Sequence, residues 1–228
     1  GHRGKDASAL QESVSKKLQK LFYTESEILL STSSGSGLME GAIRSCTSRK
    51  AAVFSCGAFG DRWYKMAVTN NVKADLYNVD MGKAITPEMV DAALATGQYD
   101  LIAVQHNETS TGITNPIEEI AEVVNKYKDV IFCVDAVSSA GGAKIEVDKL
   151  GIDILITSTQ KALGLPPGMA ICTFSERAIK RAETVEFRGT YFDLLAMYKY
   201  LKKKNYQYPS TPSLSHMFAM DYQLDNIL

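Results

Sequence analysis

Two stretches decide the fold: VIFCVDAVSS at residues 130–139 and ILITSTQKAL at residues 154–163. Each starts as a short apolar, β-branched run and then turns polar, as a buried parallel strand does where it reaches the edge of a sheet. Ligands of open parallel sheets bind at the carboxyl ends of the strands. We therefore expect Asp135, which ends the first run, and Lys161, which follows the second, to lie at a binding site.

The same alternation extends along the chain. Helical patterns separate further apolar runs, which lie at residues 28–30, 51–54, 101–105 and 169–173. Two helices have clear start signals, Thr86-Pro87-Glu88 and Pro116-Ile117. Strands that alternate with helices are typical of βαβ units, so the sequence predicts an α/β fold with a mainly parallel sheet.

Composition narrows the choice of partners. The 228 residues are 45% hydrophobic and 22% charged, enough for one substantial core, and the formal net charge is −1. Lys and Arg are spread along the chain, so neither nucleic acid nor a membrane surface is an expected partner. With no apolar run of about eighteen residues and no signal-peptide pattern, we expect a cytoplasmic protein that binds a small molecule.

The cysteines give no sign of metal or redox chemistry. Cys46, Cys56, Cys133 and Cys172 are far apart and form no C-x-x-C pair, so we expect buried free thiols in a reducing compartment. His106 follows a predicted strand, but a single histidine without a second ligand does not predict a metal site.

The segment SSGSG at residues 33–37 precedes a helical pattern that begins near Leu38. Small residues at a helix N-terminus expose backbone N–H groups, which favour a phosphate dianion. The spacing fits neither a P-loop nor a dinucleotide fingerprint. Taken alone, the segment fits a flexible turn better than a phosphate site, because a lone Gly-rich loop is a weak motif.

Asp135 and Lys161 have chemistry that fits one cofactor type. A carboxylate at the mouth of a sheet is partly desolvated and favours a cationic partner, such as a protonated pyridine nitrogen. An N-cap or a structural ion pair would explain Asp135 as well. Lys161 lies between an apolar strand and the apolar segment 162–168, so we expect its amine to turn inward, as imine chemistry requires. A solvated surface lysine is the alternative.

Two further residues near strand ends are candidates. Phe59 lies between glycines in GAFG at residues 57–60, where it could stack on a flat ring, although such a residue is also common in a core. Glu108 follows His106 and is a candidate hydrogen-bond acceptor behind the site, with capping or a solvated position as the alternative.

Four motifs occur in an order that is far more specific than any one of them: ETSTG at 108–112, DAVSS at 135–139, STQKAL at 158–163 and PPG at 166–168. Together they resemble the class V aminotransferases of pyridoxal 5'-phosphate (PLP) fold type I, most closely the alanine–glyoxylate and serine–pyruvate group. The resemblance covers nearly the whole chain. It implies a three-layer αβα sandwich in which residues 1–228 form the PLP-binding major domain, with the family's small C-terminal domain and N-terminal segment outside this chain.

The resemblance also implies roles around the cofactor ring. Lys161 would form the Schiff base with PLP, and Asp135 would be the partner of the pyridine nitrogen. Phe59 and Val137 would touch the two faces of the ring, and Thr109 would hydrogen-bond its 3-hydroxyl group.

Other residues match the family's phosphate contacts: Ser36, Gly37, the Leu38 backbone, Ser158 and Gln160. Tyr208 and Thr211 match a Tyr-x-x-Thr pair that in the family reaches the phosphate of the neighbouring subunit. This match implies a homodimer with shared active sites.

The activity implied by the resemblance is amino transfer between a small amino acid, alanine or serine, and an oxoacid, glyoxylate or pyruvate. Residues 1–5, which include His2 and Arg3, resemble the segment where phosphoserine aminotransferases bind a substrate phosphate. A phosphoserine or 2-aminoethylphosphonate aminotransferase is therefore an alternative. A desulfurase would need a cysteine in a mobile loop, which is not expected here. A non-catalytic module of the same fold should have lost Lys161 or Asp135, and both are present.

Overall fold

A seven-stranded sheet forms the centre of the molecule. The computed structural model describes all 228 residues, and its strands follow the order β1-β9-β8-β7-β4-β2-β3. The bounds are β1 Glu27–Ser31, β2 Ala51–Ser55, β3 Ala74–Asn78, β4 Leu101–Gln105, β7 Ile131–Asp135, β8 Ile154–Ser158 and β9 Ala170–Phe174. Neighbouring strands from β8 to β3 are parallel, and β9 is antiparallel to both of its neighbours. The predicted mainly parallel sheet is thus confirmed.

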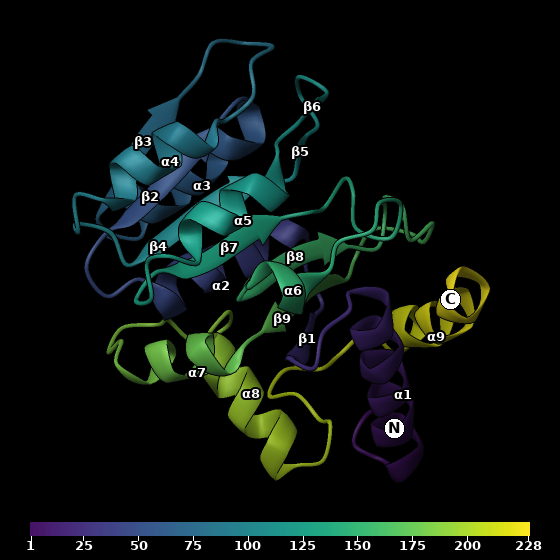
Figure 1. Ribbon diagram of the computed structural model, residues 1–228. Coiled ribbons are helices and arrows are strands. Elements are labelled where there is room, and N and C mark those ends of the chain that lie inside the picture. Colours follow the sequence, from purple (N-terminus) through teal and green to yellow (C-terminus); the bar gives the residue numbers. More distant parts are fainter.

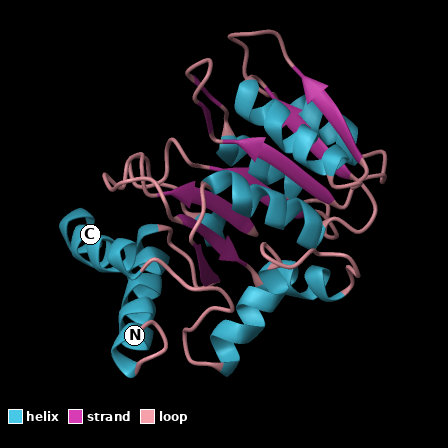
Figure 2. Cartoon of the chain, turned by 180° about the vertical axis from the view of Figure 1, so that it is seen from behind, coloured by secondary structure: helices cyan, strands magenta, loops and turns pink.

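Helices cover both faces of this sheet. Figure 1 shows one set on the near face: α4 Pro87–Leu94, α5 Ile117–Val124 and α6 Val147–Leu150. A second set lies behind the sheet, as the reverse view in Figure 2 shows: α2 Gly35–Cys46 and α3 Ala58–Thr69. The result is the expected three-layer αβα sandwich. The other elements are α1 Lys5–Leu21, α7 Glu176–Glu183, α8 Leu194–Lys203, α9 Leu214–Ile227 and a small hairpin of β5 Asn107–Glu108 and β6 Ile113–Thr114.

The degree of burial explains which strands could be predicted from the sequence. Every residue of β2, β4, β7 and β8 is buried, because helices cover both sides of these central strands. By contrast, β3 lies at the edge of the sheet and is only partly buried, so its sequence ADLYN carries no apolar run and was not predicted. The predicted start of α4 is confirmed: Thr86 Oγ1 accepts a hydrogen bond from Met89 N–H at 3.3 Å, with Pro87 in the first turn.

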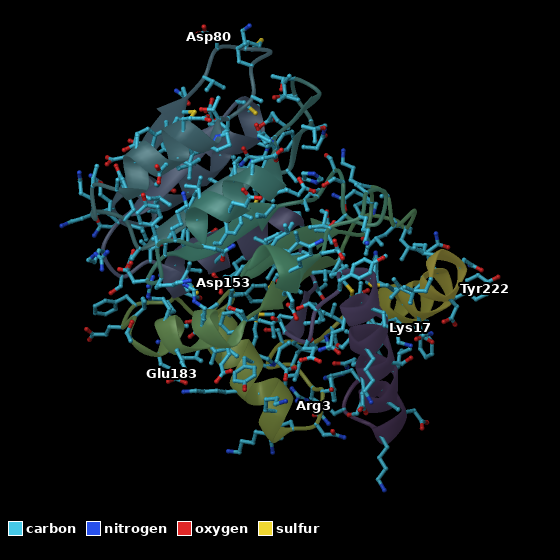
Figure 3. The ribbon with its side chains drawn as sticks, viewed as in Figure 1. Arg3, Lys17, Asp80, Asp153, Glu183 and Tyr222 are labelled. Carbon is cyan, nitrogen blue, oxygen red and sulfur yellow. The ribbon has the colours of Figure 1, made fainter.

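The first and last helices pack side by side away from the main sandwich (Figure 1). Lys17 on α1, labelled in Figure 3, pairs with Asp221 at 2.9 Å and Asp225 at 2.8 Å on α9. All four cysteines are free and buried, as expected. None of the helices is both long enough and apolar enough to span a membrane.

Candidate active site

A cleft of about 420 Å³ opens where the carboxyl ends of the central strands meet the N-termini of α2 and α3. Eight of the residues singled out in the sequence line it: Ser36, Phe59, Thr109, Asp135, Val137, Ser158, Gln160 and Lys161. Six others line it as well: Ser34, Gly35, Met39, Arg62, Asn107 and Ser138. Residues from five separate segments of the chain therefore meet at one concave site, which has the size of a small-molecule pocket.

Asp135 is the last residue of β7 and is only 5% exposed. Its Oδ1 accepts a hydrogen bond from Val137 N–H at 3.0 Å. Burial raises the pKa of Asp135 to about 6, although the Val137 N–H and the nearby Arg62 act in the opposite direction. A carboxyl group with this environment becomes a stable carboxylate when a cation is placed beside it.

One end of the cleft is suited to an anion. Helix α2 begins there at Gly35, and the side chain of its N-cap residue Ser34 makes no capping hydrogen bond. Ser158 Oγ is buried close by and has no hydrogen-bond partner. Gly35 packs so closely on Val137 that a Cβ would approach Val137 Cγ2 to 2.9 Å. A buried hydroxyl without a partner beside a helix N-terminus is what a phosphate site requires.

Lys161 lies in the turn that follows β8, on the same cleft. The turn is closed by a hydrogen bond from Gly164 N–H to the Lys161 carbonyl at 2.9 Å. The side chain is exposed, so the expectation that its amine is drawn into the interior is wrong. The chain leaves the sheet at Ser158, and the three residues of the turn carry Lys161 out to the mouth of the cleft. Gln160 is exposed there too.

Phe59 lies in the first turn of α3, and Glu108 fixes its position. The buried carboxylate of Glu108 accepts hydrogen bonds from the N–H groups of Phe59 at 3.2 Å, Gly60 at 3.0 Å and Ser110 at 3.2 Å. A Cβ on Gly57 would lie 2.6 Å from Glu108 Cγ, so only glycine allows this approach. Of the alternatives left open for Glu108, the structure shows a cap on α3 that also braces the loop of Thr109.

Thr109 is exposed at the cleft and its hydroxyl is hydrogen-bonded to Ser138 Oγ. His106 lies below, with Nδ1 2.8 Å from Ser139 Oγ. Burial lowers the pKa of His106, which favours the neutral ring. No group of three or more His, Cys, Asp or Glu side chains is placed to hold a metal ion.

Four residues singled out from the family resemblance do not line the cleft: Gly37, Leu38, Tyr208 and Thr211. Gly37 packs against Phe192, where a Cβ would clash with the ring, and its N–H donates to the Ser34 carbonyl. Leu38 is fully buried.

Tyr208 lies outside the cleft of its own chain. Its ring is only 5% exposed, and its hydroxyl accepts a hydrogen bond from Leu30 N–H at 3.1 Å within the same chain. The phenol keeps its own proton to donate, so its contact with the cofactor phosphate of a neighbouring subunit stays a prediction. Thr211, by contrast, is exposed.

Arg62 and Asn107 are the main residues that the sequence analysis missed. Arg62 comes three residues after Phe59, a spacing that puts both on one face of a helix, and this spacing could have identified it. Asn107 comes two residues after the end of β4 and begins β5, and its side chain donates to Thr114 Oγ1 at 3.1 Å on β6.

The cleft fits PLP on its own features. It offers a carboxyl group whose pKa is raised by burial, a hydroxyl without a partner at a helix N-terminus, a lysine at the mouth and an aromatic ring in the wall. These features, in an αβα sandwich, are of the kinds that would hold the phosphate, the pyridine nitrogen and the ring of PLP.

Comparison with known proteins places the chain in a family. The family model "Aminotransferase class-V" matches residues 1–227, so the chain belongs to the class V aminotransferases, which are PLP-dependent. An uncharacterised aminotransferase of Methanocaldococcus jannaschii is 42% identical over 234 residues, covering 100% of this chain and 60% of that protein. The serine–glyoxylate aminotransferase of Arabidopsis thaliana is 28% identical, covering 99% of this chain and 58% of its own length.

A solved structure agrees. The alanine–glyoxylate aminotransferase of a Nostoc species superposes with a TM-score of 0.92 at 26% identity, over 99% of this chain and 61% of its own. The chain spans about 60% of the length of the curated relatives it matches.

Proposed function

We propose that this protein is a PLP-dependent aminotransferase that moves an amino group between a small amino acid, alanine or serine, and an oxoacid, glyoxylate or pyruvate. One observation carries the proposal: Lys161, the buried Asp135 and the unpartnered Ser158 hydroxyl line a single cleft. The family membership supports the reaction type. The names of the two similar enzymes, serine–glyoxylate and alanine–glyoxylate aminotransferase, support the substrates.

Each wall of the cleft has a part in holding PLP. Ser36, Ser158 and Gln160 would bind the phosphate at the N-terminus of α2. Asp135 would accept a hydrogen bond from the pyridine nitrogen and keep that nitrogen protonated, because a buried carboxylate favours a neighbouring positive charge. Phe59 and Val137 would hold the two faces of the ring, and Thr109 its 3-hydroxyl group.

When bound, PLP supplies an electron sink for the negative charge that develops at the substrate α-carbon. Lys161 would be its covalent attachment point and then, once the substrate amine has replaced it, would move the proton from the α-carbon as a general base and acid. The position of Lys161 in an exposed turn leaves its amine free to change partners. Glu108 would act indirectly, since it holds Phe59 and the Thr109 loop in place.

We propose a homodimer in which the exposed Thr211 approaches the cofactor phosphate of the neighbouring subunit. The Tyr-x-x-Thr match and the exposure of Thr211 support this part of the proposal. Molecular mass and PLP retention measured together on Thr211→Ala test it. A monomer that retains PLP as well as the unmodified protein does would contradict the shared site.

A panel of amino donors tests the function. The purified protein is mixed with PLP, one donor and glyoxylate or pyruvate, and the new amino acid is quantified, with Lys161→Ala as the inactive control. We expect alanine or serine to donate best. Activity with only phosphoserine or 2-aminoethylphosphonate would favour that alternative, and bound PLP without transfer from any donor would show a non-catalytic module.

A further inference from the structure

Arg62 is a cleft residue with no role in the function proposed above. It lies on α3, one turn after Phe59, and lines the cleft. Its Nη1 donates a hydrogen bond to Ser36 Oγ at 3.0 Å, and its Cζ lies 4.8 Å from the centre of the Phe59 ring. The guanidinium group is thus held by contacts to two residues that themselves face the cofactor site.

No carboxylate neutralises this guanidinium group. The ion pairs of the chain involve other lysines and arginines, and Arg62 is in none of them. Arg62 lowers the pKa of Asp135 by its charge but forms no ion pair with it, and the Oδ1 of this buried carboxyl group accepts the Val137 N–H. Most of the five N–H donors of Arg62 therefore remain available to a ligand in the cleft.

The position of Arg62 is electrostatically unusual. Ser36 is the second residue of α2, so the guanidinium group lies at the positive end of the helix dipole. Two positive potentials meet there without an anion from this chain. Near the same helix start, Ser158 Oγ lies 3.7 Å from the position that a Cβ on Gly35 would take, and it is buried and without a partner.

Three features line the cleft near the start of α2: a planar cation, a helix N-terminus and a buried free hydroxyl. A tetrahedral dianion satisfies all of them, because its oxygens accept from the guanidinium fork, the backbone N–H groups and the hydroxyl together. We propose that Arg62 is a further ligand of the PLP phosphate, an inference that rests on the proposed function. By also stacking on Phe59, Arg62 links the phosphate contact to the aromatic residue that faces the ring.

Binding of pyridoxamine phosphate tests this inference without any contribution from a covalent bond, because this compound cannot form a Schiff base with Lys161. Its Kd is compared with that of pyridoxamine, which lacks the phosphate, in Arg62→Gln and in the unmodified protein. We expect Arg62→Gln to raise the Kd of pyridoxamine phosphate about tenfold, which corresponds to the loss of one charge-assisted hydrogen bond. The Kd of pyridoxamine should stay unchanged. Arg62→Lys should recover part of the lost affinity, since lysine keeps the positive charge but not the paired N–H donors of the guanidinium group.

Lys65→Gln is the matched control, because it removes a positive charge from the same helix at an exposed position outside the cleft. It should leave both Kd values unchanged. Inorganic phosphate should also compete less effectively with pyridoxamine phosphate in Arg62→Gln than in the unmodified protein.

Three results would overturn the inference. An unchanged Kd for pyridoxamine phosphate in Arg62→Gln would remove Arg62 from the phosphate site. An equal rise in the Kd of pyridoxamine phosphate and of pyridoxamine would show that Arg62 acts on the ring through Phe59. A raised KM for the oxoacid with an unchanged Kd would assign it to the substrate carboxylate. Failure of the proposed function itself looks different, because the unmodified protein would then bind neither pyridoxamine phosphate nor PLP.

Discussion

Replacing Asp135 with asparagine should stabilise the cofactor-free protein while it removes activity. Burial raises the pKa of this carboxyl group from the ordinary 3.8 to about 6. Each pKa unit corresponds to about 1.4 kcal/mol, so burying the ionised form costs on the order of 3 kcal/mol of folding free energy at neutral pH. Asparagine has the same shape, carries no charge and keeps an oxygen for the Val137 N–H.

The effect has a defined pH dependence. Because the folded-state pKa lies above the unfolded one, the folded protein binds more protons between these two values, and its stability falls as the pH rises through this window. Below about pH 4 the carboxyl group is protonated in both states, so the variant should gain nothing. The gain should grow up to about pH 6 and then stay constant.

Urea denaturation of the cofactor-free proteins between pH 4 and 8 measures this difference directly. With PLP bound, the variant should turn over substrate more slowly than the unmodified protein, because asparagine can no longer keep the pyridine nitrogen protonated. An Asp135→Asn variant that is no more stable at pH 8 than at pH 4, relative to the unmodified protein, would refute the reasoning.

Two further substitutions separate structural from cofactor-binding roles. Glu108→Gln should lower the free energy of unfolding by about 1–3 kcal/mol in urea denaturation, since the buried charge-assisted bonds to Phe59 and Gly60 weaken, and should also weaken pyridoxamine phosphate binding. Unchanged stability would show that the cap on α3 contributes nothing. Tyr208→Phe should lower stability by about 1 kcal/mol, because Leu30 N–H loses its partner, and should leave the Kd for pyridoxamine phosphate unaltered. A raised Kd for pyridoxamine phosphate would place Tyr208 at the cofactor site.

Sequence patterns predicted the parts of the fold that burial controls. The central strands are buried on both faces, so their apolar runs stand out, and the polar residues that follow them, such as Asp135 and Ser158, meet at one edge as parallel topology requires. The partly buried edge strand β3 has no such run and was missed.

The errors have physical causes that local sequence does not contain. The inward turn expected of Lys161 depended on its apolar flanks, but the length of the turn after β8 places the side chain at the surface. The motif that contains Tyr208 did not predict that its hydroxyl accepts a hydrogen bond from Leu30 N–H, 178 residues away in the chain. The spacing of Arg62 from Phe59 could have identified it, but its hydrogen bond to Ser36, on a different helix, is visible only in the structure. Long-range contacts of this kind require the three-dimensional arrangement.

Reduction of the PLP-loaded protein with borohydride tests the central claim most directly, since it fixes the cofactor to the amine that holds it. Peptide mapping by mass spectrometry then identifies the modified residue. The account predicts a pyridoxyl group on Lys161, no fixed cofactor in Lys161→Ala, and normal labelling in the control Lys65→Gln. A pyridoxyl group on any other lysine of the unmodified protein, or equal labelling in Lys161→Ala, would contradict it.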